Sequence, residues 1–211
     1  MTTESTRKPR ERYRAQVRDE VKQRAWEQIA ANGVTALSLN AIAKEMGMTG
    51  PALYRYFAGR DELITALIRD AYRSLADTVR AAHEAGTTVV ALAAVIREWA
   101  LSDPQRYLLI YGTPVPGYHA PDDITAISDE ILAVLLEVCR SPHDAPQSPF
   151  DVFLGMDRGW ASTVAAPSPT VHRALSFWTR VQGVLSLELA GHFTPMGFDP
   201  GLLLAEEVAD L

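Results

Sequence analysis

The segment SLNAIAKEMGMTGPALYRYF, from Ser38 to Phe57, decides how the rest of the chain is interpreted. It contains two short helical patterns separated by Gly47. Ser38 is placed to cap the first helix, and Thr49 to cap the second, which has Pro51 in its first turn. Two short helices joined by a tight glycine turn make a helix-turn-helix, whose second helix can enter the major groove of DNA.

The residue types in the second helix suit contact with a duplex. Its small first residues would let the backbone approach base edges, while tyrosine hydroxyls and arginine charges behind them would reach phosphates. The alternative is that Tyr54 and Phe57 are core aromatics and that the arginines only keep the surface soluble. We predict DNA contacts from eight residues: Ser38, Thr49, Gly50, Pro51, Tyr54, Arg55, Tyr56 and Arg60.

The charges of the chain are segregated along the sequence. Residues 1–60 carry 11 Lys and Arg against 6 Asp and Glu, a net of +5, whereas the whole chain has a net charge of −6. A basic N-terminal part on an acidic body predicts a polyanionic partner at one end only. The N-terminal arm contributes much of this charge, through Arg7, Lys8, Arg10, Arg12 and Arg14.

Apolar residues recur at helical spacing along most of the chain, and no strand-like alternation lasts for more than a few residues. The sequence therefore predicts an all-α protein with two parts: an N-terminal unit of residues 1–60, which carries the helix-turn-helix, and a larger helical body of residues 61–211. Beyond the helix-turn-helix, helices are expected at about 14–32, 59–82, 88–101, 104–111, 124–140, 150–164, 168–191 and 200–210.

The segment GVTALSLNAIAKEMGMTGPALYRYFAGRDELITALI, Gly33–Ile68, closely resembles the DNA-binding signature of the TetR family of transcriptional regulators. The resemblance rests on the Ala-Leu-Tyr-x-Tyr-Phe core and on a basic residue shortly after it. It implies DNA contacts at Thr49, Gly50, Tyr54, Tyr56 and Arg60. Two positions depart from the pattern: Arg55 stands where His or another polar residue is frequent, and Gly59 where Ser usually caps the next helix.

The C-terminal body is similar to the WHG-type C-terminal domain found in some TetR relatives, on the segments Arg106–Tyr118 and Ser176–Phe193. That motif has His where this chain has Gln182. A polar amide within an apolar helical stripe must find hydrogen-bond partners, either inside the protein or on a ligand. Aromatic residues in this body either form its core or wall a ligand pocket, whose candidate residues are Trp99, Tyr107, Tyr111, Trp160, Trp178 and Gln182.

The helix expected at 168–191 has two faces. One is apolar and runs through Val171, Ala174, Leu175, Trp178, Val181, Leu185 and Leu189. The other is a small-residue seam with heptad spacing, made of Ser176, Thr179, Gly183, Ser186 and Ala190. The family resemblance implies a homodimer built on the last long helices, and the seam is the candidate contact. Alternatively, the seam packs against another helix of its own subunit.

The sequence contains no signature of an enzyme. There is no Gly-x-Ser-x-Gly elbow, phosphate-binding loop or Cys-x-x-Cys, and the five histidines have no metal-ligand spacing. We therefore expect neither catalysis nor a metal or cofactor. A single cysteine, no secretory signal and no long apolar run predict a cytoplasmic protein that does not enter the membrane, with Cys139 as a buried thiol.

Together these features predict a homodimeric DNA-binding regulator, most simply a repressor. Its operator would be pseudo-palindromic, and a small-molecule effector would release it. A helical small-molecule-binding protein or a small enzyme without an operator is the alternative.

Overall fold

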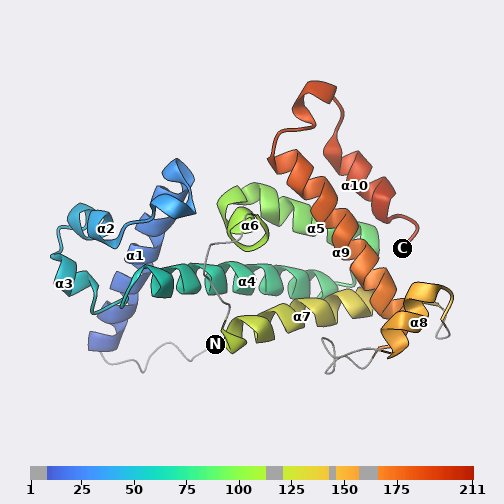
Figure 1. Ribbon diagram of the computed structural model, residues 1–211, viewed down its shortest axis with the longest axis horizontal. Helices are drawn as coiled ribbons and strands as arrows, with labels where there is room; N and C mark the ends of the chain where they lie inside the picture. Colours follow the sequence, from blue (N-terminus) through green and yellow to red (C-terminus); the bar gives the residue numbers. More distant parts are fainter. Residues whose placement is uncertain (1–8, 113–120, 143–145, 157–165) are drawn as a thin grey trace. The chain divides into compact units, whose positions relative to one another are not determined.

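A computed structural model describes residues 9–112, 121–142, 146–156 and 166–211 (Figure 1). Within these residues the secondary structure is helical and contains no strand, which confirms the all-α prediction. The chain forms two compact units, one of Met1–Ala71 and Gln105–Ala120 and the other of Tyr72–Pro104 and Pro121–Leu211. No helix in the described ranges is long and apolar enough to cross a membrane.

The first unit contains the helix-turn-helix. Helix α1 buries Val17, Val21, Ala25 and Ile29, which lie on one stripe because of their i+4 spacing. It ends at Gly33, whose φ of 76° is a left-handed conformation that glycine adopts without strain. The elements of this unit are α1 (Pro9–Asn32), η1 (Val34–Ala36), α2 (Leu39–Glu45), α3 (Gly50–Leu53), the first part of α4 (Arg60–Glu84) and most of α6 (Pro104–Tyr111).

The core of the first unit includes side chains of α2, of α3 and of the segment that follows α3. Ile42, Leu53 and Phe57 are completely buried there. Phe57 is therefore a core aromatic, as the sequence indicated. Met46, the C-cap residue of α2, is half-buried.

The second unit is built around α9 (Ser168–Leu189), which packs against α5, α7, α8 and α10. Its buried face differs slightly from the predicted stripe. Trp178 is only half-buried, while Phe177 and Val184 are buried. A helix that contacts several neighbours buries more than one stripe, and a single wheel projection misses this. The other elements are α5 (Val89–Ser102), α7 (Asp122–Val138), α8 (Pro149–Met156), η3 (Thr194–Met196) and α10 (Pro200–Val208).

The predicted helix boundaries agree with the structure within about two residues for most elements, the usual precision of helix ends. Two short 3₁₀ helices, η1 and η3, were not predicted. The helix expected at 150–164 is present as α8, which is described to Met156; the remainder of that range lies outside the described residues.

Two bidentate ion pairs tie helices of the second unit together. Arg97 on α5 donates from Nε and Nη2 to the Glu188 carboxylate on α9, at 2.9 and 2.6 Å. Arg73 on α4 donates from Nη1 and Nη2 to the Glu130 carboxylate on α7, at 2.8 and 2.6 Å. Glu188 therefore has an arginine partner on α5, whereas His192, four residues later, lies beyond the end of α9. These pairs fix the orientation of helices by planar, two-point contacts.

Cys139 is completely buried, as predicted, and its burial raises the pKa of the thiol to about 11, against a smaller lowering by Arg173. At pH 8 only about 0.1% of such a thiol is the reactive thiolate. We therefore expect no measurable reaction of the native protein with Ellman's reagent within minutes at pH 8, and one rapid equivalent in urea. Rapid reaction of the native protein would contradict this burial.

Candidate nucleic-acid interface

The turn between α2 and α3 is held by backbone and capping bonds. The Ser38 hydroxyl oxygen accepts the Ala41 N–H at 3.3 Å and caps α2. At the other end, Gly47 has a φ of 65°, and the Met48 N–H donates to the Ala43 carbonyl at 2.8 Å. The prediction of a glycine-turned helix-turn-helix is therefore confirmed in its local geometry.

The predicted DNA-contacting residues divide by exposure. Tyr54 is 45% exposed, which excludes its interpretation as a core aromatic. Thr49 stands at the N-cap of α3, but its hydroxyl oxygen accepts no capping bond from the helix. The exposed members are Thr49, Pro51, Tyr54 and Arg55, whereas Ser38, Gly50, Tyr56 and Arg60 are half-buried.

Gly50 stands where α3 approaches α2. A Cβ built at this position would lie 3.4 Å from the Asn40 side-chain oxygen on α2. This distance is at the close end of ordinary van der Waals contact. Glycine therefore keeps the start of α3 near α2 and leaves its backbone uncovered, as an approach to base edges requires.

Arg60 is the first residue of α4, and part of its guanidinium is used within the protein. Its Nη2 donates to the Val34 carbonyl of η1 at 2.7 Å. Arg60 therefore anchors the 3₁₀ turn that precedes α2. The predicted phosphate contact would have to come from its remaining N–H groups.

A chain of contacts from α1 fixes the segment that follows α3. Arg14 Nη2 donates to the Arg55 carbonyl at 3.3 Å, and Arg18 donates to the Tyr56 carbonyl. The Arg18 guanidinium also lies over the Phe57 ring, 4.0 Å from its centroid. The exposed Tyr54 side chain therefore starts from a backbone segment that α1 holds in place.

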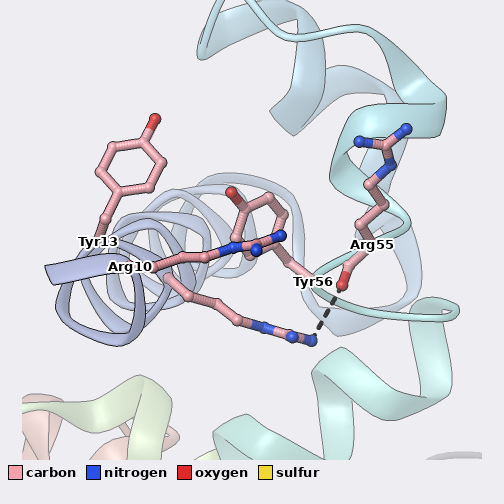
Figure 2. A pocket seen from close by; sticks show the side chains of 5 residues that line it. Arg10, Tyr13, Arg55 and Tyr56 are labelled. Atoms are coloured by element: carbon pink, nitrogen blue, oxygen red, sulfur yellow. Dashed lines mark hydrogen bonds between the residues drawn. The ribbon is translucent and has the colours of Figure 1, made fainter. Parts of the chain in front are cut away.

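A cleft of about 270 Å³ opens between α1 and this segment (Figure 2). Arg10, Tyr13 and Arg14 line it from α1, and Arg55 and Tyr56 line it from the segment after α3. Sequence reasoning assigned Arg10 and Arg14 to a basic arm and missed Tyr13. The missed signal was Pro9 at the first helical position with Glu11 in the first turn, which starts α1 early enough to place these residues on one helix face.

The residues predicted to form a ligand pocket fall into two groups. Trp99 is 8% exposed and donates from Nε1 to the Ser74 hydroxyl at 3.1 Å; it belongs to the second unit with Trp178 and Gln182, which are half-buried on α9. Tyr107 is 1% exposed and packs on Tyr111, with ring centroids 5.5 Å apart, on α6 of the first unit. Trp160 lies outside the described residues.

The small-residue seam is a surface feature of α9. Thr179, Gly183, Ser186 and Ala190 are all exposed, and Ser176 is half-buried. Nothing lies within 4 Å of a Cβ built on Gly183. Within the described part of the chain, the seam therefore does not pack against another helix of its own subunit.

A histidine–carboxylate pair fixes α8 to α9. Asp151, which is buried, lies 2.8 Å from His172 Nδ1 through Oδ1, and its Oδ2 accepts the Gln147 and Ser148 N–H groups at 2.8 and 2.9 Å. Burial raises the pKa of Asp151, but these hydrogen bonds together outweigh it and hold the pKa below its usual value.

The lowered pKa predicts how stability depends on pH. A carboxyl with a lower pKa in the folded state stabilises the fold above its unfolded pKa of about 3.9, and this contribution is lost as pH falls through the folded pKa. We expect Asp151→Asn to lower the Tm at pH 7 by about 3–6 °C. The difference from wild type should shrink below about pH 4. A difference that stays constant down to pH 3 would contradict this role of the ionised carboxylate.

Comparison with known proteins shows which family models and which relatives the sequence matches. Residues 23–67 match the family model described as bacterial regulatory proteins, tetR family, and residues 89–211 match the model described as tetracyclin repressor-like, C-terminal domain. The HTH-type transcriptional regulator Rv1816 of Mycobacterium tuberculosis (strain ATCC 25618 / H37Rv) is 34% identical over 208 residues, covering 90% of this chain and 88% of that protein.

Solved structures of other proteins have a similar fold. The crystal structure of the regulatory protein SCO4313 is 62% identical, with a TM-score of 0.89 over 96% of this chain and 98% of that one. A transcriptional regulator FadR from Bacillus subtilis, solved in complex with stearoyl-CoA, is 14% identical, with a TM-score of 0.58 over 90% of this chain and 95% of that one, and shares the fold. The family models, the sequence relative and the helix-turn-helix geometry agree, and this chain belongs to the TetR family of transcriptional regulators.

Proposed function

We propose that this regulator is a homodimeric repressor that binds a pseudo-palindromic operator and is released from it by a small molecule. The observation that carries the proposal is the exposed face of α3, where Thr49, Pro51 and Tyr54 project from a backbone that α1 and α2 hold in place. Residues 1–60 would bind DNA, and residues 61–211 would pair subunits and bind the effector.

The DNA-binding mode follows from the geometry of α3. Its small first residues would approach base edges in the major groove, while Tyr54 and Tyr56 would donate hydroxyl hydrogen bonds to phosphates on either side. A two-fold dimer would place its two α3 helices in successive major grooves, about 34 Å apart. The operator would therefore be a pseudo-palindrome with half-sites one helical turn apart, or a multiple of this.

Two neighbouring surfaces of the second unit support pairing of subunits. The seam on α9 is exposed and made of small side chains, which allow close helix approach. Helix α8, which packs against α9, exposes large apolar side chains that water solvates poorly: Phe150, Val152, Phe153 and Met156, at 43, 44, 56 and 82% exposure. A second copy of the chain would bury both surfaces.

Release by a small molecule would be a shift between two populations of the dimer. An effector that binds the body more tightly when the two α3 helices are badly spaced would lower the affinity for the operator by the same coupling factor. Helix α4 is continuous from the first unit into the second and would transmit the change. The pocket candidates in the second unit are Trp99, Trp178 and Gln182, whereas Tyr107 and Tyr111 belong to the first unit.

The proposal is tested by a gel shift against the DNA upstream of the protein's own gene, with mass spectrometry of the natively purified protein to identify a retained small molecule. We expect a protein–DNA complex that migrates more slowly than free DNA, and we expect the retained molecule to dissociate it. Equal operator affinity of the apo and ligand-bound protein would refute induced release. If unlabelled DNA of scrambled sequence displaced the protein as well as the unlabelled upstream DNA does, sequence-specific binding would be refuted.

A further inference from the structure

The cleft between α1 and the segment after α3 has a basic lining without an internal counter-charge. Three of its five lining residues are arginines, the other two are tyrosines, and none is acidic. In the part of the chain that the structure describes, Arg10, Arg14 and Arg55 form no ion pair. The next arginine along α1, Arg18, does form one, with Glu62 at 3.5 Å. Guanidinium groups gathered around a hollow without carboxylate partners favour an anionic occupant.

The cleft is larger than a single inorganic anion needs. Its volume of about 270 Å³ lies just below the usual range for small-molecule pockets, which begins at about 300 Å³. Inorganic phosphate or sulfate would leave most of this volume to water, whereas a phosphate ester that carries a ring system would occupy it. The volume therefore indicates an organic anion of about the size of a mononucleotide.

One face of α1 supplies both charge and an aromatic surface. Arg10, Tyr13 and Arg14 stand at i, i+3 and i+4, so their side chains are neighbours on the helix. Tyr13 is 62% exposed, which leaves its ring open to a ligand. Figure 2 shows Arg10 extending from α1 toward Tyr56, with Tyr13 and Arg55 on opposite sides. Guanidinium forks bind phosphate oxygens, and an exposed tyrosine ring stacks on a nucleobase of any kind.

Two hydrogen bonds hold the opposite wall of the cleft to α1. Arg14 Nη2 donates to the Arg55 carbonyl at 3.3 Å, and Arg18 donates to the Tyr56 carbonyl. Because both bonds end on backbone carbonyls, they do not use the side-chain donors of Arg55 and Tyr56. A cleft whose walls are already in place binds a ligand with a smaller loss of entropy.

We propose that this cleft binds a free nucleoside monophosphate, and that the bound nucleotide weakens binding of the operator. Arg10 and Arg14 hold the phosphate, which carries a charge of about −1.5 to −2 at pH 7, and the base stacks on Tyr13. Arg55 and Tyr56 line the cleft and are also predicted to contact DNA, so the nucleotide and the duplex compete for them. Nucleotide binding is independent of the proposed function, whereas the effect on the operator rests on it.

The first test measures binding without DNA. Isothermal titration calorimetry at low ionic strength compares AMP with adenosine and with inorganic phosphate. AMP should bind once per chain with a Kd on the order of 10–100 µM. Adenosine and phosphate should each bind at least about tenfold more weakly, because each keeps only one of the two kinds of contact.

Variants locate the site. Arg10→Ala and Tyr13→Ala should each weaken AMP binding at least about tenfold, whereas Tyr13→Phe, which keeps the ring, should restore it. The matched control is Arg24→Ala, because Arg24 is exposed on the same helix but does not line the cleft. This variant loses the same charge as Arg10→Ala and should bind AMP like wild type. Circular dichroism checks that each variant keeps the helical fold.

The second test measures competition on operator DNA selected with the wild-type protein in the absence of nucleotide. Fluorescence anisotropy gives the operator Kd with and without saturating AMP. AMP should raise this Kd about tenfold for wild type and Arg24→Ala, but not for Tyr13→Ala, which keeps every arginine. Sulfate at the same ionic strength serves as the control for screening and should have a smaller effect.

Four results would overturn the inference, in whole or in part. No saturable AMP binding below about 1 mM, or equal binding of AMP and phosphate, would exclude a nucleotide site. AMP binding that Arg10→Ala and Tyr13→Ala leave unchanged would place the nucleotide outside the cleft. An unchanged operator Kd, or an equal effect of sulfate, would refute the competition. If wild type selects no operator, the proposed function fails and the competition with it, while calorimetry still decides on the nucleotide site.

Discussion

Replacing Gly183 by leucine is expected to convert the proposed dimer into a monomer while leaving the subunit folded. In the single chain, a Cβ at this position meets nothing within 4 Å. Leucine also favours a helix interior over glycine by about 0.8 kcal/mol, so the substitution should not unfold α9. Only a second copy packed closely on the seam would collide with the new side chain.

Sedimentation velocity should therefore show a dimer for wild type and a monomer for Gly183→Leu. The operator affinity should fall by at least about a hundredfold, because two half-sites are no longer bound by one linked molecule. The wild-type Tm should rise with protein concentration, and that of the variant should not. Ala81→Leu, which adds an exposed leucine on α4, serves as the control and should remain dimeric. If the Gly183→Leu variant remained dimeric, the seam would not be the contact between subunits.

The double substitution of Tyr54 and Tyr56 by phenylalanine should weaken operator binding without lowering stability. Each change removes one hydroxyl, and a hydrogen bond to a phosphate contributes about 1.5 kcal/mol. A dimer loses four such bonds, so even at half this value the loss is about 3 kcal/mol, or roughly a hundredfold in the dissociation constant. Tyr54 is 45% exposed and the described contacts of the Tyr56 segment use its backbone carbonyl, so the fold does not depend on either hydroxyl.

The measurements are operator titration by fluorescence anisotropy and thermal unfolding of the same samples. The Tm should stay within about 2 °C of wild type, since surface substitutions change stability by about 0.5 kcal/mol or less. Phe57→Ala provides the contrasting control, because Phe57 is completely buried and its truncation should cost about 3–5 kcal/mol of stability. A double variant that melts like Phe57→Ala would place the tyrosines in the core instead.

The local structure of the first unit could be predicted because its determinants are local. Val17, Val21, Ala25 and Ile29 repeat at i+4, Ser38 has the side chain of a helix cap, and Gly47 takes the positive φ that a tight turn needs. Each of these properties belongs to a residue and its immediate neighbours. The helix-turn-helix therefore follows from the sequence without knowledge of the packing.

What could not be predicted depends on residues that are distant in the sequence. Arg60 donates to Val34, 26 positions away, and Asp151 pairs with His172, 21 positions away. Neither pairing has a periodicity or motif that would reveal it. The cleft could not be predicted for a related reason, since its two walls, α1 and the segment of Arg55 and Tyr56, come together only once the unit has folded.

The central claim is that the basic N-terminal module binds a DNA duplex through its groove and phosphates, while the acidic remainder pairs subunits and senses a small molecule. Its most direct test is an unbiased selection of genomic fragments on the purified protein at low ionic strength, followed by sequencing. We predict that the retained fragments share a pseudo-palindrome and that Tyr54→Phe with Tyr56→Phe reduces their recovery. Retention of no fragment above background by the wild-type protein would contradict the account.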